Sequence, residues 1–342
     1  AACLKQEFTG KRIKKMKKTI RIGTRESELS IAQTMLAVQA MKLADPDAVF
    51  EFVPKKTLGD KILERPLLAF GGKGVFVSEF EEGLLTGEID FAIHSAKDLP
   101  MELASGLDIV GVLPRGDERD VLIMLADSQA VSSQRESLTI GTSSLRRGLQ
   151  IKELGKFLWP GCTINCQNLR GNVLTRLDKL EQGLYDGIIL AAAGLERLKI
   201  PEKRAGRYQY RYFTPEEMIP AGGQGVIAIE GRKGDALSVI PETISHIPTM
   251  RQLKAERLVL KHLNAGCHEP VGIYCQEEVD GLSITGIYGT GQILNRAAVR
   301  EAELTELQGL KGTGTDQALE LLAFRLAKKL LKGIESSGGM KA

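Results

Sequence analysis

Arginine recurs just after the predicted strands of this 342-residue chain, and this recurrence indicates an anion-binding site. The guanidinium group donates hydrogen bonds from a rigid fork that matches the geometry of a carboxylate or phosphate. The arginines of this series are Arg146, Arg147, Arg170, Arg176 and Arg197. Residues 141–147 add a hydroxyl-rich turn at the start of a helix, where unpaired backbone amides also favour an anion. Several arginines at successive strand ends predict a ligand with several acidic groups.

One acidic residue, Asp98, lies just beyond a predicted strand at residues 91–94, with Lys97 beside it. Open α/β sheets bind their ligands beyond the carboxyl ends of the strands, so both side chains are candidates for a ligand site. An aspartate there can act as an acid, as a base or as the stabiliser of a positive charge. The alternative is a turn carboxylate that accepts hydrogen bonds from nearby backbone amides. His94, which ends the strand, is expected to pack in the core.

Cys267 lies in a tight turn between a predicted helix and a predicted strand, which is an exposed setting for a nucleophile. The alternative is an unreactive thiol, because a lone cysteine in a turn is usually inert. Cys162 and Cys166 are spaced as metal ligands can be, but no second Cys or His pair lies near them in the sequence. They are expected to be core thiols, and no metal site is predicted. The odd count of five cysteines indicates a reducing compartment.

Short apolar runs rich in β-forming residues alternate with helical patterns along most of the chain. Such alternation is typical of α/β folds, in which parallel strands are joined by crossover helices. The predicted strands are residues 19–23, 50–53, 91–94, 109–113, 121–125, 138–141, 163–166, 187–190 and 226–230. The predicted helices are residues 27–43, 77–85, 145–154, 172–182 and 249–263. The aromatic run at residues 208–213 is expected to be a packed loop.

Breaker residues at positions 114–117 and 215–220 enclose a block of about one domain's size. A strand-like segment after the second breaker fits a return to the first sheet, so the chain would cross between the two domains twice and form a hinge. From about residue 244 the pattern changes to that of a small α+β domain, with predicted strands at residues 271–276 and 282–288 and a closing helix at residues 316–334. The predicted boundaries are 19–114 for the first part of domain 1, 115–218 for the arginine-rich domain 2, 219–243 for the return segment of domain 1, and 244–342 for the C-terminal domain.

Composition excludes several classes of protein. With 43% hydrophobic and 26% charged residues, the chain is neither disordered nor fibrous. Its most apolar runs are too short for a membrane span or are interrupted by Arg and Lys, and a net charge of +3 does not indicate a nucleic-acid partner. The basic run at residues 11–18 lacks the apolar stretch of a secretory signal. We therefore expect a cytoplasmic protein, with the residues before about Thr19 as an extension or fusion remnant.

Several of these segments, in their order along the chain, resemble the hydroxymethylbilane synthase family, also called the porphobilinogen deaminases. The segments that carry the resemblance are residues 21–27, 71–74, 94–98, 141–147, 169–172, 175–176, 193–195, 223–225 and 265–267. The resemblance implies two domains like those of periplasmic binding proteins, a hinge of two crossovers and a small third domain. It also implies an enzyme of tetrapyrrole and heme biosynthesis. Such an enzyme condenses four porphobilinogens head to tail, releases ammonia at each step and hydrolyses the product to hydroxymethylbilane.

The resemblance assigns roles to individual residues. Asp98 is expected to be the catalytic carboxylate, which assists loss of the amino group and stabilises the positively charged azafulvene-like species. A dipyrromethane cofactor is expected on Cys267 through a thioether, with further cofactor contacts from Lys97, Thr142, Ser144, Arg146, Arg147 and Arg170. The residues expected to bind substrate are Arg25, Ser27, Lys73, Arg176 and Arg197. Each pyrrole carries an acetate and a propionate, which gives the arginines their ligand. The resemblance also suggests a monomer.

Two alternatives remain open. A solute-binding clamp without catalysis would share the two-domain architecture and the carboxylate-binding arginines, although the missing export signal and the turn at Cys267 argue against it. Alternatively, the chain is one half of a longer polypeptide that carries another tetrapyrrole enzyme, as its start without Met suggests. Covalent retention of two pyrrole units on Cys267 would favour the enzyme over the clamp.

Overall fold

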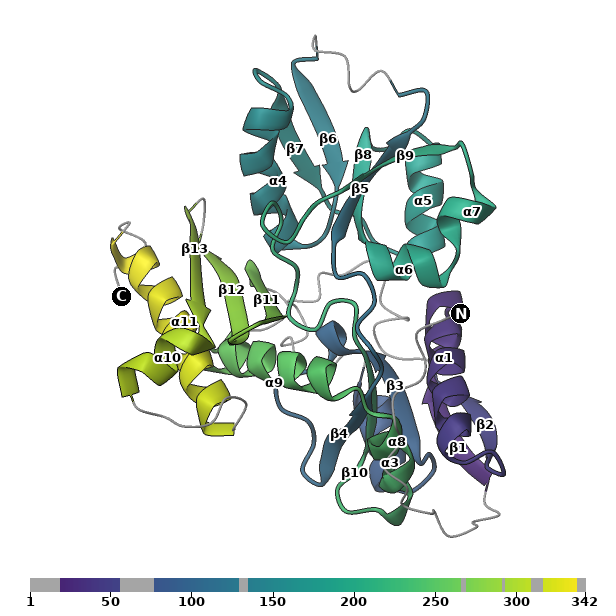
Figure 1. Cartoon of the computed structure of the whole chain (residues 1–342). Helices are drawn as coiled ribbons and strands as arrows, with labels where there is room; N and C mark the ends of the chain where they lie inside the picture. The colour runs from purple at the N-terminus through teal and green to yellow at the C-terminus, as the bar shows by residue number, and fades with distance from the viewer. Residues whose placement is uncertain are drawn as a thin grey trace.

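The computed structural model describes residues 19–55, 77–128, 135–265, 269–290, 293–308 and 316–336, which form three lobes (Figure 1). Two lobes are each built on a five-stranded sheet, and the third has a three-stranded sheet. In Figure 1 the five-stranded lobes lie at the bottom and at the top, and the third lobe lies beside their junction. Within the described residues, no helix is both long enough and apolar enough to cross a membrane.

Sheet A takes four strands from the first part of the chain and a fifth from a later segment. Its strands are β1 (Thr19–Thr24), β2 (Val49–Pro54), β3 (Phe91–Ser95), β4 (Leu107–Val112) and β10 (Ile227–Arg232). Their order is β2-β1-β3-β10-β4, and only β10 runs antiparallel to its neighbours. Alternate side chains of β1, such as Ile20 and Ile22, enter the core as the strand period requires.

Sheet B repeats this construction. Its strands are β5 (Asp120–Leu125), β6 (Ser137–Gly141), β7 (Thr163–Gln167), β8 (Gly187–Ala191) and β9 (Tyr208–Tyr212). Their order is β7-β6-β8-β5-β9, and β5 runs antiparallel to both neighbours. The chain reaches β5 from sheet A along residues 113–119 and returns to β10 along residues 213–226. We call these two segments the first and second crossovers.

The directions of β5 and β10 correct the expectation that the strands of each sheet are parallel. The sheets are not wholly parallel, because β5 and β10 each enter their sheet from the opposite lobe. The α/β fold class with a small third domain is confirmed. Since β5 and β10 are reversed, their first residues lie at the same edge as the carboxyl ends of β8 and β3, where Asp120 pairs with Ala191 and Ile227 pairs with Ser95. Both crossovers therefore meet the sheets at their ligand-binding edges.

Helices cover the two sheets, and three of the longer ones begin at polar caps. Those of the sheet A lobe are α1 (Glu28–Ala44), α3 (Ser78–Leu85), α8 (Val239–Ile244) and the short 3-10 helices η2 (Ala96–Asp98) and η4 (Ala236–Ser238). Those of the sheet B lobe are α4 (Leu145–Leu158), α5 (Val173–Glu181), α6 (Ala192–Arg197) and α7 (Ile200–Lys203). Ser27, Ser144 and Asn172 cap α1, α4 and α5 by accepting a backbone N–H of the first turn.

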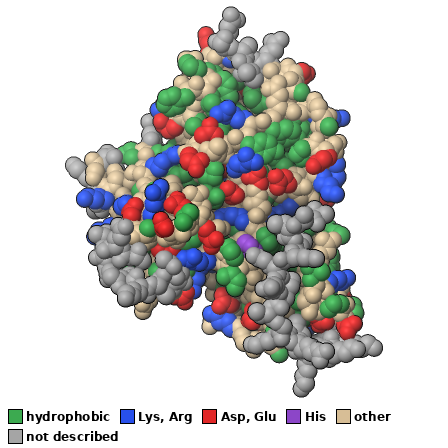
Figure 2. All heavy atoms as spheres, in the orientation of Figure 1, with side chains coloured by type: hydrophobic (Ala, Val, Ile, Leu, Met, Phe, Trp, Pro, Cys, Tyr) green, Lys and Arg blue, Asp and Glu red, His purple; other side chains and the backbone are tan. Residues whose placement is uncertain are grey.

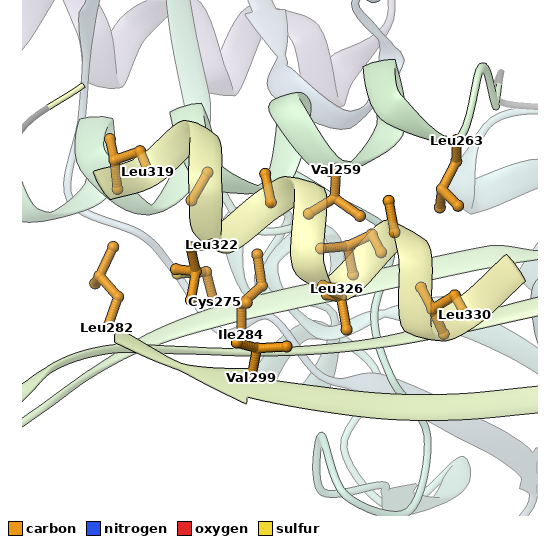
Figure 3. Close-up of a cluster of buried hydrophobic side chains, with 14 of the residues drawn as sticks. Val259, Leu263, Cys275, Leu282, Ile284, Val299, Leu319, Leu322, Leu326 and Leu330 are labelled. Carbon is orange, nitrogen blue, oxygen red and sulfur yellow. The ribbon is translucent and has the colours of Figure 1, made fainter. Parts of the chain in front are cut away.

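The third lobe packs three helices on an antiparallel sheet. Its elements are α9 (Ile247–His262), β11 (Val271–Glu278), β12 (Gly281–Thr290), β13 (Ile293–Arg300), α10 (Glu301–Gln308) and α11 (Asp316–Ser336). Figure 3 shows Leu322 and Leu326 of α11 in the same cluster as Val259 of α9 and Ile284 of β12. Cys275 belongs to this core, and burial raises the pKa of its thiol well above the ordinary value.

Two strands differ from the sequence-based expectation. Residues 208–212 form edge strand β9 rather than a packed loop, and Tyr208, Tyr210 and Tyr212 pack against the core of sheet B. The strand β13 is not predicted by the sequence pattern. Cys162 and Cys166 are partly buried and pack against the margin of a core cluster of the sheet B lobe, so they lie beside the core rather than within it. The part of the chain that the structure describes contains no group of three His, Cys, Asp or Glu side chains that could hold a metal ion.

Candidate active site

The candidate site lies where the ligand-binding edges of both sheets meet the crossovers. In the sheet A lobe, Lys97 and Asp98 belong to η2, which follows β3 directly. In the sheet B lobe, Arg146 and Arg147 lie in the first turn of α4, which follows β6. Lys97 interacts electrostatically with both arginines as well as with Asp98. The structure therefore brings together charged residues that the sequence places on different domains.

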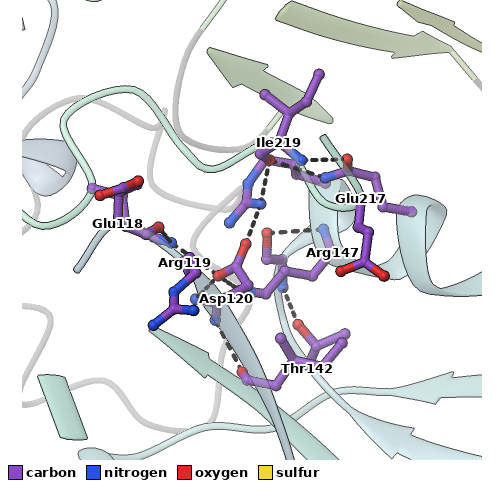
Figure 4. Close-up of polar contacts among 12 residues, drawn as sticks. Glu118, Arg119, Asp120, Thr142, Arg147, Glu217 and Ile219 are labelled. Carbon is purple, nitrogen blue, oxygen red and sulfur yellow. Dashed lines mark hydrogen bonds and ion pairs between the residues drawn. The ribbon is translucent and has the colours of Figure 1, made fainter. Parts of the chain in front are cut away.

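A buried carboxylate, Asp120, pairs with both arginines of α4 (Figure 4). Its Oδ2 accepts a hydrogen bond from Arg146 Nη1 at 2.6 Å, and its Oδ1 accepts one from Arg147 Nε at 2.9 Å and lies 2.7 Å from Arg147 Nη2. Backbone carbonyls take further donors, since Arg146 Nη1 donates to Ile219 O at 2.7 Å and Arg147 Nη1 to Ile189 O at 3.0 Å. Burial alone would raise the pKa of Asp120, but the two guanidinium groups hold it well below its usual range.

Gln224, on the second crossover, links Asp120 to Lys97. Its Nε2 donates to Asp120 Oδ1 at 3.0 Å and to Glu118 O at 2.7 Å, and its Oε1 accepts from Lys97 Nζ at 3.1 Å. Burial, followed by repulsion from Arg147, lowers the pKa of Lys97 to about 8, although Asp98 and Asp120 oppose the shift. Lys97 is therefore a basic group whose charged form an added anion would stabilise.

Arg176 and Arg170 extend the positive charge along the sheet B lobe. Arg176 Nε donates to Gly171 O at 2.8 Å. Burial and repulsion from Arg147 lower the pKa of Arg176 to about 10, with Asp98 opposing and Arg170 adding to the effect. Arg197 is held differently, because its Nη2 donates to Gly225 O of the second crossover at 2.6 Å, and burial lowers its pKa to about 10.

Among the residues that the structure describes, basic side chains outnumber acidic ones at this junction. The interacting basic residues are Lys97, Arg146, Arg147, Arg170 and Arg176. They meet two carboxylates, those of Asp98 and Asp120. The lowered pKa values of Lys97 and Arg176 reflect burial and this repulsion, which a ligand with several carboxylates would relieve. On the face drawn in Figure 2, acidic and basic side chains are interspersed, so on that face no single sign of charge covers the surface.

The predicted hydroxyl ligands form part of the helix caps. Ser144 Oγ accepts from Arg147 N at 3.4 Å, and Thr142 Oγ1 accepts from Ser144 N at 3.2 Å. Ser27 Oγ accepts from Ser30 N at 3.2 Å at the start of α1, shortly after Arg25. These bonds fix the turns from which the neighbouring arginines extend. Contacts of these hydroxyls with a ligand remain a prediction.

His94 packs in the sheet A lobe, as expected. Its Nε2 lies 2.8 Å from Glu230 Oε2, and its ring meets that of Phe80 edge-on with centroids 5.5 Å apart. Both His94 and Glu230 are buried, beneath the helix α3 that contributes Phe80. His94 therefore connects β3 to β10 and α3 and does not reach the charged junction through any contact described here.

Cys267 and Lys73, two of the predicted site residues, lie outside the described residues. The strand that follows Cys267 is described, and it begins at the site. A Cβ added to Gly272 of β11 would lie 3.0 Å from Arg146 Cδ and 2.8 Å from Ile219 O. The backbone of β11 thus packs directly on Arg146, a few residues after Cys267 in the sequence.

One buried ion pair ties the third lobe to both crossovers. Arg115 of the first crossover donates from Nη1 and Nη2 to the two carboxylate oxygens of Glu256 at 2.8 and 2.9 Å. Gly223 N of the second crossover donates to the same carboxylate at 2.6 Å, and so does Cys275 N at 2.8 Å. Because Glu256 belongs to α9, the third lobe holds the crossovers beside the site.

Sequence reasoning misses Asp120, Gln224, Arg115 and Glu256. An aspartate directly before the apolar run at residues 121–125 is a usable signal for Asp120, because a charge at the start of a buried strand requires a partner. No local pattern identifies that partner, which lies on another element. Gln224 falls within the segment 223–225 that carries the family resemblance, but the resemblance assigned it no role.

The fold and the site define a two-lobed α/β protein in which basic residues gather beside an exposed carboxylate and a third lobe packs on the crossovers. The chain belongs to the porphobilinogen deaminase family. Residues 20–239 match the model of the family's dipyromethane cofactor binding domain, and residues 250–332 match that of its C-terminal domain. The predicted family, enzyme class, tetrapyrrole pathway and dipyrromethane cofactor are thereby confirmed.

Curated porphobilinogen deaminases are similar along most of the chain. That of Acetivibrio thermocellus is 36% identical over 319 residues, which cover 93% of this chain and 99% of the relative. That of Rickettsia prowazekii is 38% identical over 307 residues, which cover 89% and 98%. Among solved structures, a periplasmic sulfonate-binding protein from Methylobacillus flagellatus is 17% identical, with a TM-score of 0.34 over 72% of this chain and 68% of the other.

Proposed function

We propose that this chain condenses four porphobilinogens head to tail on a covalently bound dipyrromethane, releases ammonia at each addition and hydrolyses the product to hydroxymethylbilane. The observation that carries the proposal is the excess of positive charge on buried and partly buried side chains around the exposed Asp98. Every pyrrole of such a chain bears two carboxylates, so the growing product is a polyanion. We further propose a monomer, on the family resemblance, that acts in the cytoplasm without a nucleic-acid partner, on the charge and sequence pattern described above.

Asp98 is proposed as the catalytic carboxylate. It is exposed on η2, and it interacts electrostatically with Lys97 and Arg176. When the amino group leaves porphobilinogen, positive charge develops on the pyrrole, and a carboxylate placed beside that charge lowers the barrier. Carboxylate oxygens also accept hydrogen bonds from pyrrole N–H groups. Asp98 would thus orient the substrate and stabilise the charge that the reaction creates.

The basic residues are proposed to hold the acetate and propionate groups. Within the described residues, one N–H of each terminal nitrogen of Arg147 has a partner, because Nη2 contacts Asp120 and Nη1 donates to Ile189 O. Each of these nitrogens carries a second hydrogen that we propose for a ligand carboxylate. The residues proposed to bind the cofactor are Lys97, Thr142, Ser144, Arg146, Arg147 and Arg170. Those proposed to bind substrate are Arg25, Ser27, Lys73, Arg176 and Arg197.

The charge of the described residues fits a dipyrromethane, which is itself a polyanion. Five interacting basic side chains face two carboxylates, so a ligand with several negative charges is the one that balances them. Cys267 would hold this group through a thioether. When bound, the group supplies the pyrrole to which the first substrate unit is joined. The chain's own residues bind its carboxylates and keep Asp98 within reach of the pyrroles.

Intact mass under denaturing conditions tests the proposal. We expect the chain to be heavier by a dipyrromethane, and peptide mapping to place the added mass on the peptide that contains Cys267. Cys267→Ser should lack the added mass and consume no porphobilinogen. Cys162→Ser is the matched control, because Cys162 is a partly exposed thiol away from the site, and it should keep both. An unmodified chain that binds porphobilinogen without consuming it would favour the solute-binding clamp.

A further inference from the structure

Asp120 is the buried acceptor on which the basic residues of the site converge. It is the first residue of β5, and its side chain is fully buried. Both carboxylate oxygens accept from arginine, and Oδ1 also accepts from Gln224 Nε2. The function proposed above gives Asp120 no contact with substrate or cofactor. A buried carboxylate is unfavourable unless it has partners, so the role of Asp120 must lie in the side chains that it binds.

The backbone of Asp120 is fixed on both sides by sheet B. It pairs with Ala191 of β8, and its carbonyl accepts a hydrogen bond from Phe213 N at 2.9 Å. Because β5 runs antiparallel, this first residue lies at the edge where β8 ends. The carboxylate is therefore a rigid acceptor, and the long side chains of Arg146 and Arg147 must adapt to it.

Gln224 extends the arrangement to the other lobe. Glu118 O and the carboxylate of Asp120 can only accept, so they require the Nε2 side of the amide, whereas Lys97 Nζ can only donate and requires Oε1. These partners determine the orientation of the amide. Lys97 belongs to the sheet A lobe and Asp120 to the sheet B lobe, so one neutral buried side chain joins charged groups of both lobes.

We propose that Asp120 and Gln224 are positioning residues for the condensation reaction: Asp120 fixes the guanidinium groups of Arg146 and Arg147, and Gln224 fixes the ammonium group of Lys97 relative to them. The inference rests on the proposed function, which assigns those three basic residues to the carboxylates of the cofactor. Asp120 neutralises one of the two guanidinium charges and leaves an equal charge for the ligand. Charges held in place before binding need no reorganisation, so the ligand takes a single pose beside Asp98.

Asp120→Asn tests the role of the carboxylate. The substitution keeps the shape of the side chain but turns one acceptor into a donor that faces a guanidinium group. We expect kcat/KM for porphobilinogen to fall about 10- to 100-fold, the size typical of a lost charged hydrogen bond. The pH profile gives a second readout. Since Asp120 favours the charged form of Lys97, its loss should move the alkaline fall of kcat/KM to lower pH.

Gln224→Glu should move the same profile in the opposite direction. The groups that face Lys97 in the described residues are Arg146, Arg147, Asp98, Asp120 and Gln224. A carboxylate in place of the Gln224 amide adds a negative charge next to Lys97 Nζ and raises the pKa of that ammonium group. The alkaline fall of kcat/KM should therefore move to higher pH. A residue with only a structural role would not shift the profile in a direction set by its charge.

Asp90→Asn is the matched control. Asp90 is also buried and also accepts from two arginines, but it lies at the opposite edge of sheet A, before β3. We expect this variant to lose stability and to keep the kcat/KM and the pH profile of the parent. The same loss of kcat/KM with the same shift in Asp90→Asn would overturn the inference, because any buried Arg–Asp cluster would then matter equally.

Two further outcomes decide the matter. If Asp120→Asn and Gln224→Glu fold and keep the parent's kcat/KM and pH profile, the positioning role is wrong. If Asp120→Asn does not fold, Gln224→Glu decides alone, and an unshifted profile in that variant overturns the inference.

A parent protein that consumes no porphobilinogen would contradict the proposed function itself. Activity in the parent with unaffected variants would contradict only the positioning role, so the two failures are distinguishable.

Discussion

Two clusters in this protein place a pair of arginines around a buried aspartate, at opposite edges of the sheets. Asp90 accepts from Arg21 Nη2 at 3.1 Å and from Arg232 Nη2 at 3.4 Å, and Arg232 also pairs with Asp235 at 2.7 Å. The side chains of Arg21 and Arg232 are 38% and 25% exposed. In the described residues, Asp120 is the one carboxylate that pairs with Arg146 and Arg147. The side chains of these arginines are only 4% and 8% exposed.

From this difference we infer that charge balance, rather than the presence of Arg–Asp pairs, distinguishes a structural cluster from the proposed ligand site. The Asp90 cluster has two acids for two bases, and Arg232 also donates to the carbonyls of Leu84 and Ile89. The Asp120 cluster has one carboxylate for two guanidinium groups, so one positive charge is not neutralised. It also lies beside further basic residues, among them Lys97. An excess of like charge on buried and partly buried side chains is unfavourable until a counter-charge arrives, so we infer that function outweighs stability at this place.

The largest effect is expected from Asp98→Asn, which removes the exposed carboxylate that the structure describes in the unbalanced region. Porphobilinogen consumption should fall about a thousandfold, as when a group that stabilises transition-state charge is lost. Folding and bound pyrroles should be retained, because Asp98 is exposed. Steady-state kinetics with intact mass of the same sample measures both. Asp108→Asn, which changes another exposed carboxylate on edge strand β4, is the control and should keep parent activity.

The variants Arg147→Lys and Arg21→Lys make the same change in the two clusters, so their KM values compare the clusters directly. A lysine cannot reproduce a forked contact with Asp120 and a ligand carboxylate together, so KM for porphobilinogen should rise about 10- to 100-fold. Arg21→Lys makes the same change in the balanced cluster and should leave KM within about twofold of the parent. Equal changes in KM for the two variants would contradict the distinction between the clusters.

The pH dependence of binding follows from Lys97. Its pKa is lowered to about 8 in the protein, and a bound carboxylate would raise it, so binding takes up a proton. Affinity should therefore be highest below pH 8 and fall as the pH rises above it, by up to about tenfold per pH unit. KM measured from pH 7 to pH 9.5 tests this, with Lys97→Arg as the variant that should abolish the fall. A KM that stays constant across that range would contradict the role of Lys97.

The smallest effect on activity is expected from Asp90→Asn. Its cluster is balanced and lies away from the site, so kcat/KM should not change. The free energy of unfolding should fall by about 2 kcal/mol, since a buried acceptor of charged hydrogen bonds is weakened. Denaturant titration gives the stability and the standard assay gives the activity. A strong loss of activity with unchanged stability would reverse the roles assigned to the two clusters.

Much of the fold follows from local sequence pattern. The strands β1 to β8 and β10 lie within a few residues of their predicted positions. The order and direction of the strands do not follow, because β5 and β10 are reversed by pairings between distant segments. β13 is hidden because the sequence of residues 293–300 mixes polar and apolar side chains without clean alternation. In β9, Tyr alternates with Gln and Arg, which is a valid strand signal masked by the nearby breakers.

The sequence predicts the site residues that directly follow strands. It does not predict pairs whose members lie far apart in the sequence. Lys97, Asp98 and Arg147 were placed at strand ends by the sequence, and the structure brings them together. Asp120 binds arginines 26 and 27 positions away, and Gln224 binds Lys97 across 127 positions. Such partners are set by the crossing of the chain between lobes, which no short window of sequence reveals.

A crystal structure of the protein with its pyrroles bound is the most direct test of the unbalanced charge at the junction. We expect ligand carboxylates within hydrogen-bond distance of Arg147 and Lys97, a pyrrole N–H facing Asp98, and Asp120 still paired with both arginines of α4. Pyrroles bound elsewhere, with Arg147 contacting only Asp120 and Ile189 O as it does here, would contradict the account.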